Sequence, residues 1–358
     1  MATPKNNVFV SSQSVISIQE LQQEPMKTLP QNYVLSKQEP PTPLPHANQL
    51  LPTIDMNRFA SMEEFHLELH KLHSACQHWG FFQLVNHGVS TELLEKLKHE
   101  MEGFFKLPLE EKMKYKIRTG EVEGYGSVAR PGIIPEGKLD WADRFYMTTN
   151  PVHRRKPYLF PELPSSLRST LDTYMLELQN LGMELFGLIA KALKIEVKEM
   201  KEIFEDGMQS VRLTLYPPCP QPELVIGFTP HSDATGITIL NQVNEVDGLQ
   251  IKRDGIWYPV SFLPNALVVN VGDILEILSN GIYHSIEHRA AVNSEKERMS
   301  IAFFINPKFE VEVGPLPSLI NQQNPPLYKR MGMEEYVKGF FSRKLDGKSY
   351  LNHMRVEP

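Results

Sequence analysis

The sequence predicts a mainly β fold with flanking α-helices, built around a barrel or jelly roll. Between residues 61 and about 190, apolar side chains recur every three or four positions, which is the period of helices that bury one face. From about Gln209 onward they alternate in short runs separated by turn residues, which is typical of strands. We therefore expect helices from the first half of the chain to face a β core from the second half.

Composition and charge limit the class of protein. The 358 residues include 37 Lys and Arg against 43 Asp and Glu, a net charge of −6, without a basic tract. This argues against a nucleic-acid-binding surface and against a polybasic membrane patch. No apolar run approaches the roughly 20 residues of a membrane span, and the N-terminus lacks the apolar run of a signal peptide. Cys76 and Cys219 cannot form a disulfide framework. We expect a cytoplasmic protein, and a monomer because no exposed heptad pattern is present.

Changes in composition divide the chain into four regions. Residues 1–50 are polar and proline-rich, which predicts an extended arm or linker because proline fixes φ and removes a backbone donor. Residues 51–205 are expected to form a helical region and residues 206–310 the β core. Residues 311–358 are expected to form a C-terminal helical segment.

The helical region also contains two short strand-like runs. Ser61 and Glu64 have the spacing of a capping box before the first helix. Residues 119–138 hold many Gly and Pro without a clear period, which fits a lid, a pocket wall or a plain surface loop. The elements expected here, in chain order, are a strand at 51–56, a helix at 65–79, a strand at 81–85, a helix at 94–101 and the longest helix at 167–188.

The β core is predicted from alternating or continuous apolar runs with turn signals between them. Asp254-Gly255 separates two such runs and is a strong signal for a β-hairpin. The other expected strands lie at 211–216, 237–240, 249–252, 266–271 and 300–305.

Three residues of this core form a candidate metal site. His231 and Asp233 are two positions apart, so in a strand their side chains point to the same face. His288 follows on another strand-like segment, and His284 shares its parity, so parity alone does not choose between them. Two His and one carboxylate form the facial triad of non-haem Fe(II) oxygenases, with three coordination positions open.

A second pair follows shortly after His288. Arg298 and Ser300 are again two positions apart and share a strand face. The planar fork of Arg suits a carboxylate, and the Ser hydroxyl adds a donor, so the pair could anchor a dicarboxylate. By itself, an Arg-x-Ser pair also fits a surface salt bridge. The order of His-x-Asp, then His, then Arg-x-Ser is more specific than any of its parts.

Longer stretches of the chain, in both halves, support a resemblance. The chain resembles the plant 2-oxoglutarate- and Fe(II)-dependent dioxygenases from about Leu51 to the C-terminus, especially the specialised-metabolism branch that includes alkaloid and flavonoid O-demethylases. The stretches that carry the likeness are Trp79-Gly80-Phe81-Phe82-Gln83-Leu84-Val85-Asn86-His87-Gly88, Glu123-Gly124-Tyr125-Gly126, Leu139-Asp140-Trp141-Ala142-Asp143, Tyr216-Pro217-Pro218-Cys219-Pro220-Gln221-Pro222, His231-Ser232-Asp233, Asn270-Val271-Gly272-Asp273, Ser285-Ile286-Glu287-His288-Arg289 and Arg298-Met299-Ser300.

The resemblance implies a fold, cofactors and residue roles. The fold is a distorted double-stranded β-helix (jelly roll) faced by helices. Fe(II) is held by His231, Asp233 and His288, and 2-oxoglutarate by Arg298 and Ser300 with Tyr216 beside it. O2 is the second cosubstrate and ascorbate a supporting reductant. The implied reaction hydroxylates or O-demethylates a small aromatic metabolite, a methoxylated flavonoid or alkaloid, with release of succinate and CO2.

The sequence departs from the family pattern in two places. Family members often have Asn where this chain has Thr214, two residues before Tyr216, and a hydroxyl is shorter than an amide. Residues 127–138 also differ from the Gln-rich, acidic run of close relatives. Because this loop borders the substrate pocket in the family, its divergence suggests an altered choice of substrate.

Four further positions line the substrate cavity in relatives and are candidates here: Arg212, Phe145, Phe304 and Asn306. The two Phe rings could stack on a flat aromatic substrate or simply pack in the core. Three alternatives remain: a hydroxylase or desaturase of a plant hormone, a non-catalytic jelly-roll binding protein, and a structural zinc protein. The third is disfavoured because the sequence offers no closed set of four zinc ligands.

Overall fold

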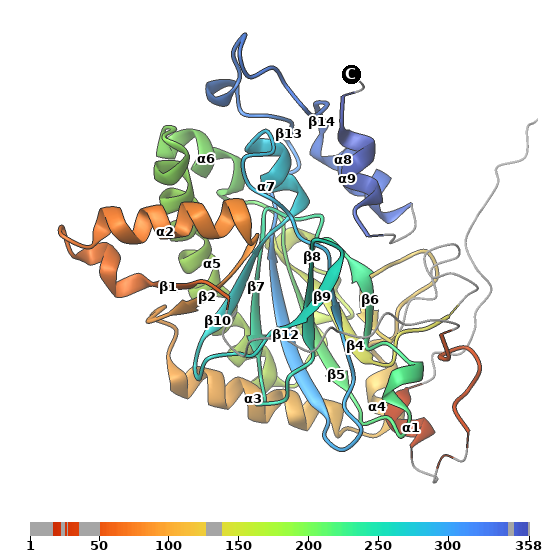
Figure 1. Cartoon of the computed structure of the whole chain (residues 1–358). Coiled ribbons are helices and arrows are strands. Elements are labelled where there is room, and N and C mark those ends of the chain that lie inside the picture. Colours follow the sequence, from red (N-terminus) through yellow and green to blue (C-terminus); the bar gives the residue numbers. More distant parts are fainter. Residues whose placement is uncertain are drawn as a thin grey trace, which may run out of the picture.

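Two β-sheets pack face to face in the computed structural model, and helices cover the outer face of the larger sheet (Figure 1). The structure describes residues 17–22, 26, 28–35, 51–126, 138–342 and 347–356. Most of the divergent loop, residues 127–137, lies outside the described ranges. No helix in the described ranges is both long enough and apolar enough to cross a membrane.

The helices and strands follow the predicted periods. The α-helices are α1 (Ile18–Leu21), α2 (Phe65–His78), α3 (Thr91–Phe105), α4 (Leu109–Met113), α5 (Ser165–Leu193), α6 (Val197–Phe204), α7 (Asp273–Leu278), α8 (Met333–Phe341) and α9 (Ser349–Met354). Short 3-10 helices are η1 (Met56–Ala60), η3 (Val152–Arg154), η4 (Phe160–Glu162), η5 (Pro222–Leu224) and η6 (Pro317–Leu319). The strands are β1 (Thr53–Asp55), β2 (Phe81–Val85), β3 (Gly124–Tyr125), β4 (Asp143–Asn150), β5 (Gln209–Tyr216), β6 (Phe228–His231), β7 (Ile237–Gln242), β8 (Leu249–Arg253), β9 (Ile256–Pro259), β10 (Leu267–Val271), β11 (His288–Ala290), β12 (Arg298–Ile305), β13 (Glu312–Val313) and β14 (Met331–Gly332).

The sheet topology confirms the predicted jelly-roll core. The large sheet has the order β1-β2-β10-β7-β12-β5-β4-β3, and the small sheet the order β6-β11-β8-β9. Every pair is antiparallel except β1 with β2. Strands β10 and β12 are buried along their whole length, because one face meets the helices and the other meets the small sheet.

Strands from both halves of the chain contribute to the large sheet. β1 to β4 come from the region expected to be helical, and they extend the sheet on both sides of its C-terminal strands. The predicted boundary at residues 205 and 206 therefore separates a mainly helical part of the chain from a mainly β part. Strands from both parts belong to one sheet. The hairpin expected at Asp254-Gly255 is present, and both residues have the positive φ, 51° and 78°, that a type I′ turn requires.

The described part of the N-terminal arm contacts the sheet. Residues 18–21, which were expected to be extended, form the short helix α1. Asp143 of β4 accepts hydrogen bonds from Ser17 Oγ at 2.7 Å and from the backbone N–H of Ile18 at 2.8 Å. Tyr33 packs edge-on against Trp141 with 5.3 Å between ring centroids. These contacts overcome the extended preference of the polar arm.

Candidate active site

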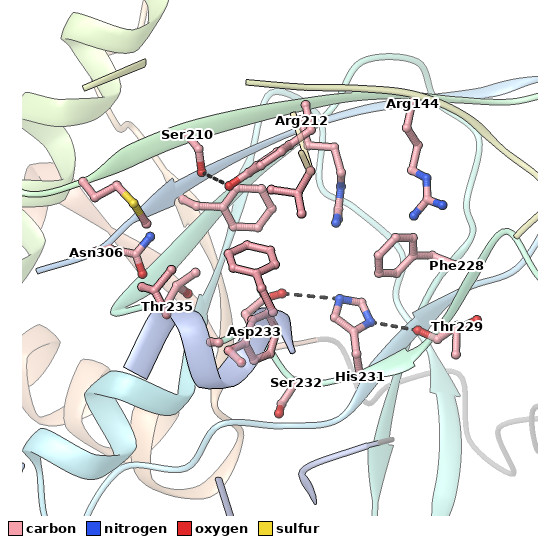
Figure 2. A pocket seen from close by; sticks show the side chains of 18 of the residues that line it. Arg144, Ser210, Arg212, Phe228, Thr229, His231, Ser232, Asp233, Thr235 and Asn306 are labelled. Atoms are coloured by element: carbon pink, nitrogen blue, oxygen red, sulfur yellow. Dashed lines mark hydrogen bonds and ion pairs between the residues drawn. The ribbon is translucent and has the colours of Figure 1, made fainter. Parts of the chain in front are cut away.

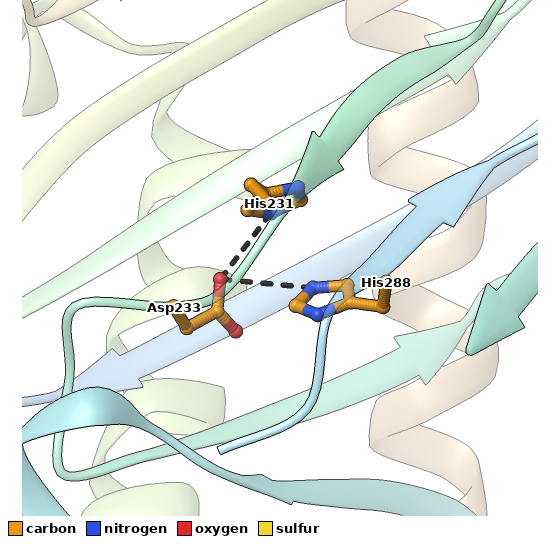
Figure 3. A group of neighbouring side chains, drawn as sticks. All are labelled: His231, Asp233 and His288. Carbon is orange, nitrogen blue, oxygen red and sulfur yellow. Dashed lines mark ion pairs between the residues drawn. The ribbon is translucent and has the colours of Figure 1, made fainter. Parts of the chain in front are cut away.

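The three predicted metal-ligating residues meet between the two sheets. His231 ends β6, Asp233 follows two residues later, and His288 begins β11 directly opposite His231 in the antiparallel pair. Their potential ligand atoms all lie within 4.8 Å of one another, and all three side chains are buried (Figure 3). The alternative, His284, is exposed and lies before β11 begins. The strand start therefore selects His288.

Hydrogen bonds orient each imidazole toward the centre of this group. Nδ1 of His231 lies 2.9 Å from the carbonyl oxygen of Thr229, and Nδ1 of His288 lies 3.1 Å from that of Ile286. A carbonyl can only accept, so both Nδ1 atoms carry a proton, and in the neutral tautomer that this fixes, Nε2 presents the lone pair. These Nε2 atoms lie 3.4 Å and 3.7 Å from Oδ1 of Asp233.

The carboxylate of Asp233 is fixed in a similar way. Its Oδ2 accepts hydrogen bonds from Thr238 Oγ1 at 2.7 Å and from Asn270 Nδ2 at 2.8 Å. Only Oδ1 is left facing the two imidazoles. Partners of this kind set the direction and basicity of metal ligands.

Burial and charge favour the protonation states that bind metal. Burial alone would raise the pKa of Asp233, but His288, His231 and the hydrogen bond from Asn270 hold this pKa well below its usual range. Burial lowers the pKa of His288 to about 4. At neutral pH the group therefore offers one carboxylate and a neutral His288 imidazole.

The donor set fits a divalent iron ion. Nε2 of His231 is buried and has no hydrogen-bond partner, which is costly unless a ligand completes it. The two imidazoles and one carboxylate leave three coordination positions open, as oxygen-activating iron requires. Within the described ranges no fourth His, Cys, Asp or Glu joins the group, so it does not match a closed structural zinc site.

A cavity beside the triad contains the residues predicted to hold a dicarboxylate. Arg298 and Ser300 on β12 lie opposite Tyr216 and Thr214 on β5. Arg298 is only 2% exposed, its guanidinium carbon lies 5.0 Å from the centre of the Tyr216 ring, and its Nη1 donates to Ser300 Oγ at 3.4 Å. A Cβ on Gly248 would lie 2.7 Å from Cδ of Arg298, so only glycine leaves room for this side chain.

Arg298 is poised to bind an anion. Its Nε is buried without a hydrogen-bond partner. A buried cation is unfavourable unless it is paired and hydrogen-bonded, so a carboxylate ligand would complete it. Thr214 is also buried, but it is not among the described residues that line this cavity. The shorter side chain at this position therefore leaves the wall formed by Arg298, Ser300 and Tyr216 in place.

A second and larger cavity opens to solvent on the other side of the triad. Its empty volume is about 1150 Å³ and that of the first cavity is about 440 Å³, where both values include space open to solvent. Both cavities are lined by Arg212, Phe228, His231 and Asp233 (Figure 2). The triad thus lies where the two cavities meet, so a ligand in each could approach the same metal.

Three of the four predicted pocket residues line the larger cavity: Arg212, Phe304 and Asn306. The expectation for Phe145 is wrong. Phe145 is fully buried in the main core, where it stacks on Phe104 with 5.0 Å between ring centroids. Side chains alternate along β4, so its neighbours Arg144 and Tyr146 point into the cavity instead.

Sequence reasoning missed the contribution of α8. Four of its residues, Tyr336, Val337, Phe340 and Phe341, line the larger cavity. Their spacing is that of an apolar helical face, which could also have been ordinary core packing.

Buried polar contacts hold the C-terminal segment in place. Tyr350 donates from its hydroxyl to the carbonyl oxygen of Tyr336 at 2.8 Å. The buried carboxylate of Glu276 accepts from Lys348 Nζ at 2.9 Å and from the Tyr328 hydroxyl at 2.8 Å. Together these contacts keep α8 beside the cavity.

Two cationic side chains enter the larger cavity from β4 and β5 (Figure 2). The guanidinium carbon of Arg212 lies 4.3 Å from the centre of the Phe228 ring and 5.2 Å from that of Phe304. Arg144 lies 5.0 Å from the Phe228 ring and forms an ion pair with Asp140 at 3.2 Å. Within the described part of the chain, no carboxylate forms such a pair with Arg212, and its Nε has no hydrogen-bond partner.

Comparisons with known proteins agree with this geometry. Residues 205–307 match the model of the 2OG-Fe(II) oxygenase superfamily, and residues 51–164 match that of the N-terminal region of a non-haem dioxygenase in morphine synthesis. An oxoglutarate-dependent flavonoid 7-O-demethylase of Ocimum basilicum is 48% identical over 97% of this chain and 92% of its own length. The chain belongs to the 2OG-Fe(II) oxygenase superfamily. Codeine O-demethylase of Papaver somniferum is 47% identical over 99% of this dioxygenase and 100% of its own length.

A solved structure shares the fold of this dioxygenase. The crystal structure of JOX2 in complex with 2OG, Fe and JA has a TM-score of 0.86 and 34% identity, and covers 96% of this chain and 99% of that chain. The enzyme is therefore a 2-oxoglutarate-dependent dioxygenase that uses Fe(II), as the sequence predicted. The two adjoining cavities fit this chemistry, which needs a cosubstrate and a substrate at one metal.

Proposed function

We propose that this dioxygenase hydroxylates or O-demethylates a small, methoxylated aromatic compound of plant specialised metabolism, with release of succinate and CO2. The observation that carries the proposal is the larger cavity, which meets the triad and is walled by the aromatic rings of Phe228, Phe304 and α8. Flat aromatic ligands pack well against such rings. The flavonoid and codeine O-demethylases among the relatives support the same reaction type.

The predicted metal and cosubstrate residues each have a role in this proposal. His231, Asp233 and His288 would hold the iron, since both Nε2 atoms and Oδ1 of Asp233 face one another. Arg298 and Ser300, with Tyr216 beside them, would hold the distal carboxylate of 2-oxoglutarate. Bound Fe(II), with 2-oxoglutarate as the reductant for O2, supplies the oxidising power to attack a C–H bond.

The protein's part in the reaction is to orient the substrate and exclude solvent. Phe228 and Phe304 both line the cavity, and the Phe228 ring lies against His231, so an aromatic ring held there presents its substituents to the triad. If the attacked carbon is an O-methyl group, one oxygen atom of O2 is inserted into its C–H bond and the other enters succinate. In the resulting hemiacetal the bond between the aryl oxygen and the former methyl carbon breaks and the hydroxyl proton moves to that oxygen, which yields a phenol and formaldehyde.

The charge of the larger cavity favours flavonoid-type substrates over alkaloids. Arg144 is neutralised by Asp140, but Arg212 has no paired carboxylate in the described part of the chain. A guanidinium attracts phenolate, carbonyl or carboxylate oxygens and repels a protonated amine. We therefore place methoxylated flavonoids ahead of O-methylated alkaloids, which carry an ammonium group at neutral pH. The same arginine favours a second candidate reaction, the hydroxylation of a small carboxylic acid.

Substrate-dependent turnover tests the proposal. The purified enzyme with Fe(II), 2-oxoglutarate and ascorbate would be offered methoxylated flavones, O-methylated alkaloids and small carboxylic acids in parallel. Succinate would be quantified for every compound, and formaldehyde for the methoxylated ones. We expect succinate and formaldehyde in equal amounts with at least one flavone. Stimulation by the carboxylic acids alone would favour the second candidate, and stimulation by none of the three classes would refute the proposal.

A variant tests the charge argument separately. Arg212→Met keeps a long apolar side chain and removes the cation. Loss of one charge-assisted hydrogen bond is worth about 1.5–3 kcal/mol, so kcat/KM for the preferred flavone should fall roughly 10- to 150-fold. Turnover of the amine-bearing alkaloids should stay the same or rise. A wild-type preference for the protonated amine would contradict the argument.

A further inference from the structure

The strand that carries His231 lies at the edge of its sheet. β6 pairs with β11 on one side, and beyond that pair the described residues give it an isolated parallel bridge between His231 and Gly347. It is four residues long, and Pro230 within it has no backbone N–H. A short edge strand has few ladder bonds of its own, so other contacts must fix the position of His231.

Asp140 holds this strand at Thr229, two residues before His231. Its Oδ1 accepts from the backbone N–H of Thr229 at 3.0 Å and from the hydroxyl of Thr229 at 2.6 Å. At Thr229 a carboxylate thus accepts the backbone N–H, as a neighbouring strand would. Asp140 is itself 4% exposed, and its other oxygen is held by Nη1 of Arg144 at 3.2 Å. Both carboxylate oxygens are therefore engaged, which fixes its orientation.

The same threonine connects Asp140 to the metal site. The carbonyl oxygen of Thr229 accepts the Nδ1 proton of His231 at 2.9 Å (Figure 2). This bond sets both the tautomer and the ring direction of the imidazole. A continuous series of polar contacts therefore connects Arg144 through Asp140 and Thr229 to His231. It begins in the wall of the larger cavity, where Arg144 lies.

We propose that Asp140 is a positioning residue for His231, which holds the edge strand so that Nε2 points at the metal. The inference rests on the proposed role of His231 as an iron ligand. It does not require Asp140 to touch substrate, cosubstrate or metal. Removing its carboxylate should free Thr229 and weaken metal binding, because outer partners of metal ligands typically contribute roughly 10- to 100-fold to affinity.

The chain provides a matched control three residues away. Asp143 is also a buried aspartate of the 139–143 segment, at 2% exposure. Its carboxylate accepts hydrogen bonds from Ser17, Ile18 and Gln19 of the N-terminal segment. A role in general folding would make the two aspartates equivalent, whereas the positioning role is specific to Asp140.

The experiment measures metal affinity without turnover. Full-length apo protein would be titrated anaerobically with Co(II), read by its visible d–d absorption, and then with Fe(II) in the presence of 2-oxoglutarate. Asp140→Ala should bind both metals roughly 10- to 100-fold more weakly. Asp140→Asn should show a smaller loss, since its amide oxygen can still accept from Thr229. Asp143→Asn should match wild type. Circular dichroism of each apo variant reports on folding.

The outcomes separate this inference from the proposed function. Wild-type affinity in Asp140→Ala, or an equal loss in Asp143→Asn, would overturn the positioning role and leave the iron site intact. A wild-type protein that binds neither metal would overturn the ligand assignment and this inference with it. If Asp140→Ala does not fold, Thr229→Val carries the test, because it removes one of the two bonds to Asp140 and retains the backbone. Unchanged affinity there would count against the role.

Discussion

Arg298→Met would separate cosubstrate binding from protein stability. The side chain is 2% exposed and its Nε has no hydrogen-bond partner, so the cation is poorly compensated when 2-oxoglutarate is absent. Burial lowers the pKa of Arg298, which reflects the same unfavourable environment. Methionine has a similar length and is apolar, and replacing an unpaired buried charge in this way is often neutral or stabilising.

The expected effect on the cosubstrate is large. Arg298 offers a charge-assisted hydrogen bond to the distal carboxylate, worth about 1.5–3 kcal/mol, so the dissociation constant for 2-oxoglutarate should rise roughly 10- to 150-fold. The apo protein should unfold at the same temperature as wild type or above it. The KM for the aromatic substrate should change little, because Arg298 lines the smaller cavity and not the larger one in the described part of the chain.

Two assays are needed. Anaerobic titration of the Fe(II)-loaded protein with 2-oxoglutarate, followed by the visible charge-transfer band, gives the affinity, and thermal unfolding of the apo protein gives the stability. Arg154→Met is a control, since Arg154 is exposed and packs on Phe309 away from both cavities. Equal increases in the requirement for 2-oxoglutarate and for substrate would refute the anchoring role. A marked loss of apo stability would refute the view that the cation is unpaired.

Further predictions concern the triad, the two cavities and pH. His231→Ala and Asp233→Ala should each abolish substrate-dependent succinate formation and leave the circular dichroism spectrum unchanged; substantial activity in either variant would refute the triad. Phe145→Ala should lower the free energy of unfolding by about 3–5 kcal/mol, because it leaves a cavity in the core, and should not alter substrate preference. Phe304→Ala should change the KM for the substrate instead. If denaturation and kinetic assays gave the Phe145 result for Phe304 and the Phe304 result for Phe145, the two residues would be assigned to the wrong faces of the sheet. Because burial lowers the folded-state pKa of His288 from 6.5 to about 4, the unfolded chain binds more protons between these values. Stability of the apo protein should therefore fall as pH drops from about 6.5 towards 4. His288→Gln should reduce that slope in pH-dependent unfolding, and an unchanged slope would show that another group is responsible.

The site residues could be predicted where strand parity controls them. Arg298 and Ser300 share a face of β12 because spacing by two fixes the side of a strand. Asp233 lies after β6 has ended at His231, so its place beside His231 does not follow from strand parity alone. Parity could not choose between His284 and His288, since the choice depends on where β11 begins. Only the start of pairing opposite His231 decides it.

Other features depend on contacts between distant parts of the chain. Phe145 carries an aromatic ring like Phe304, but the register of β4 on β5 turns it toward Phe104 in the core. The wall formed by α8 and the bond between Asp140 and Thr229 likewise join segments that no local pattern connects. The jelly-roll core was accessible from the sequence because alternation and turn residues are local.

The two cavities meet at the triad, and this arrangement bears on how such enzymes diversify. The wall around Arg298 is built from central strands of the core, whereas much of the larger cavity is built from α8 and from the segment before β4. Mutations in α8 can change which compound is oxidised without touching the metal site, whereas the segment before β4 also contains Asp140. For protein engineering, an exchange of α8 between relatives is accordingly a safer first step than any change in β5 or β12.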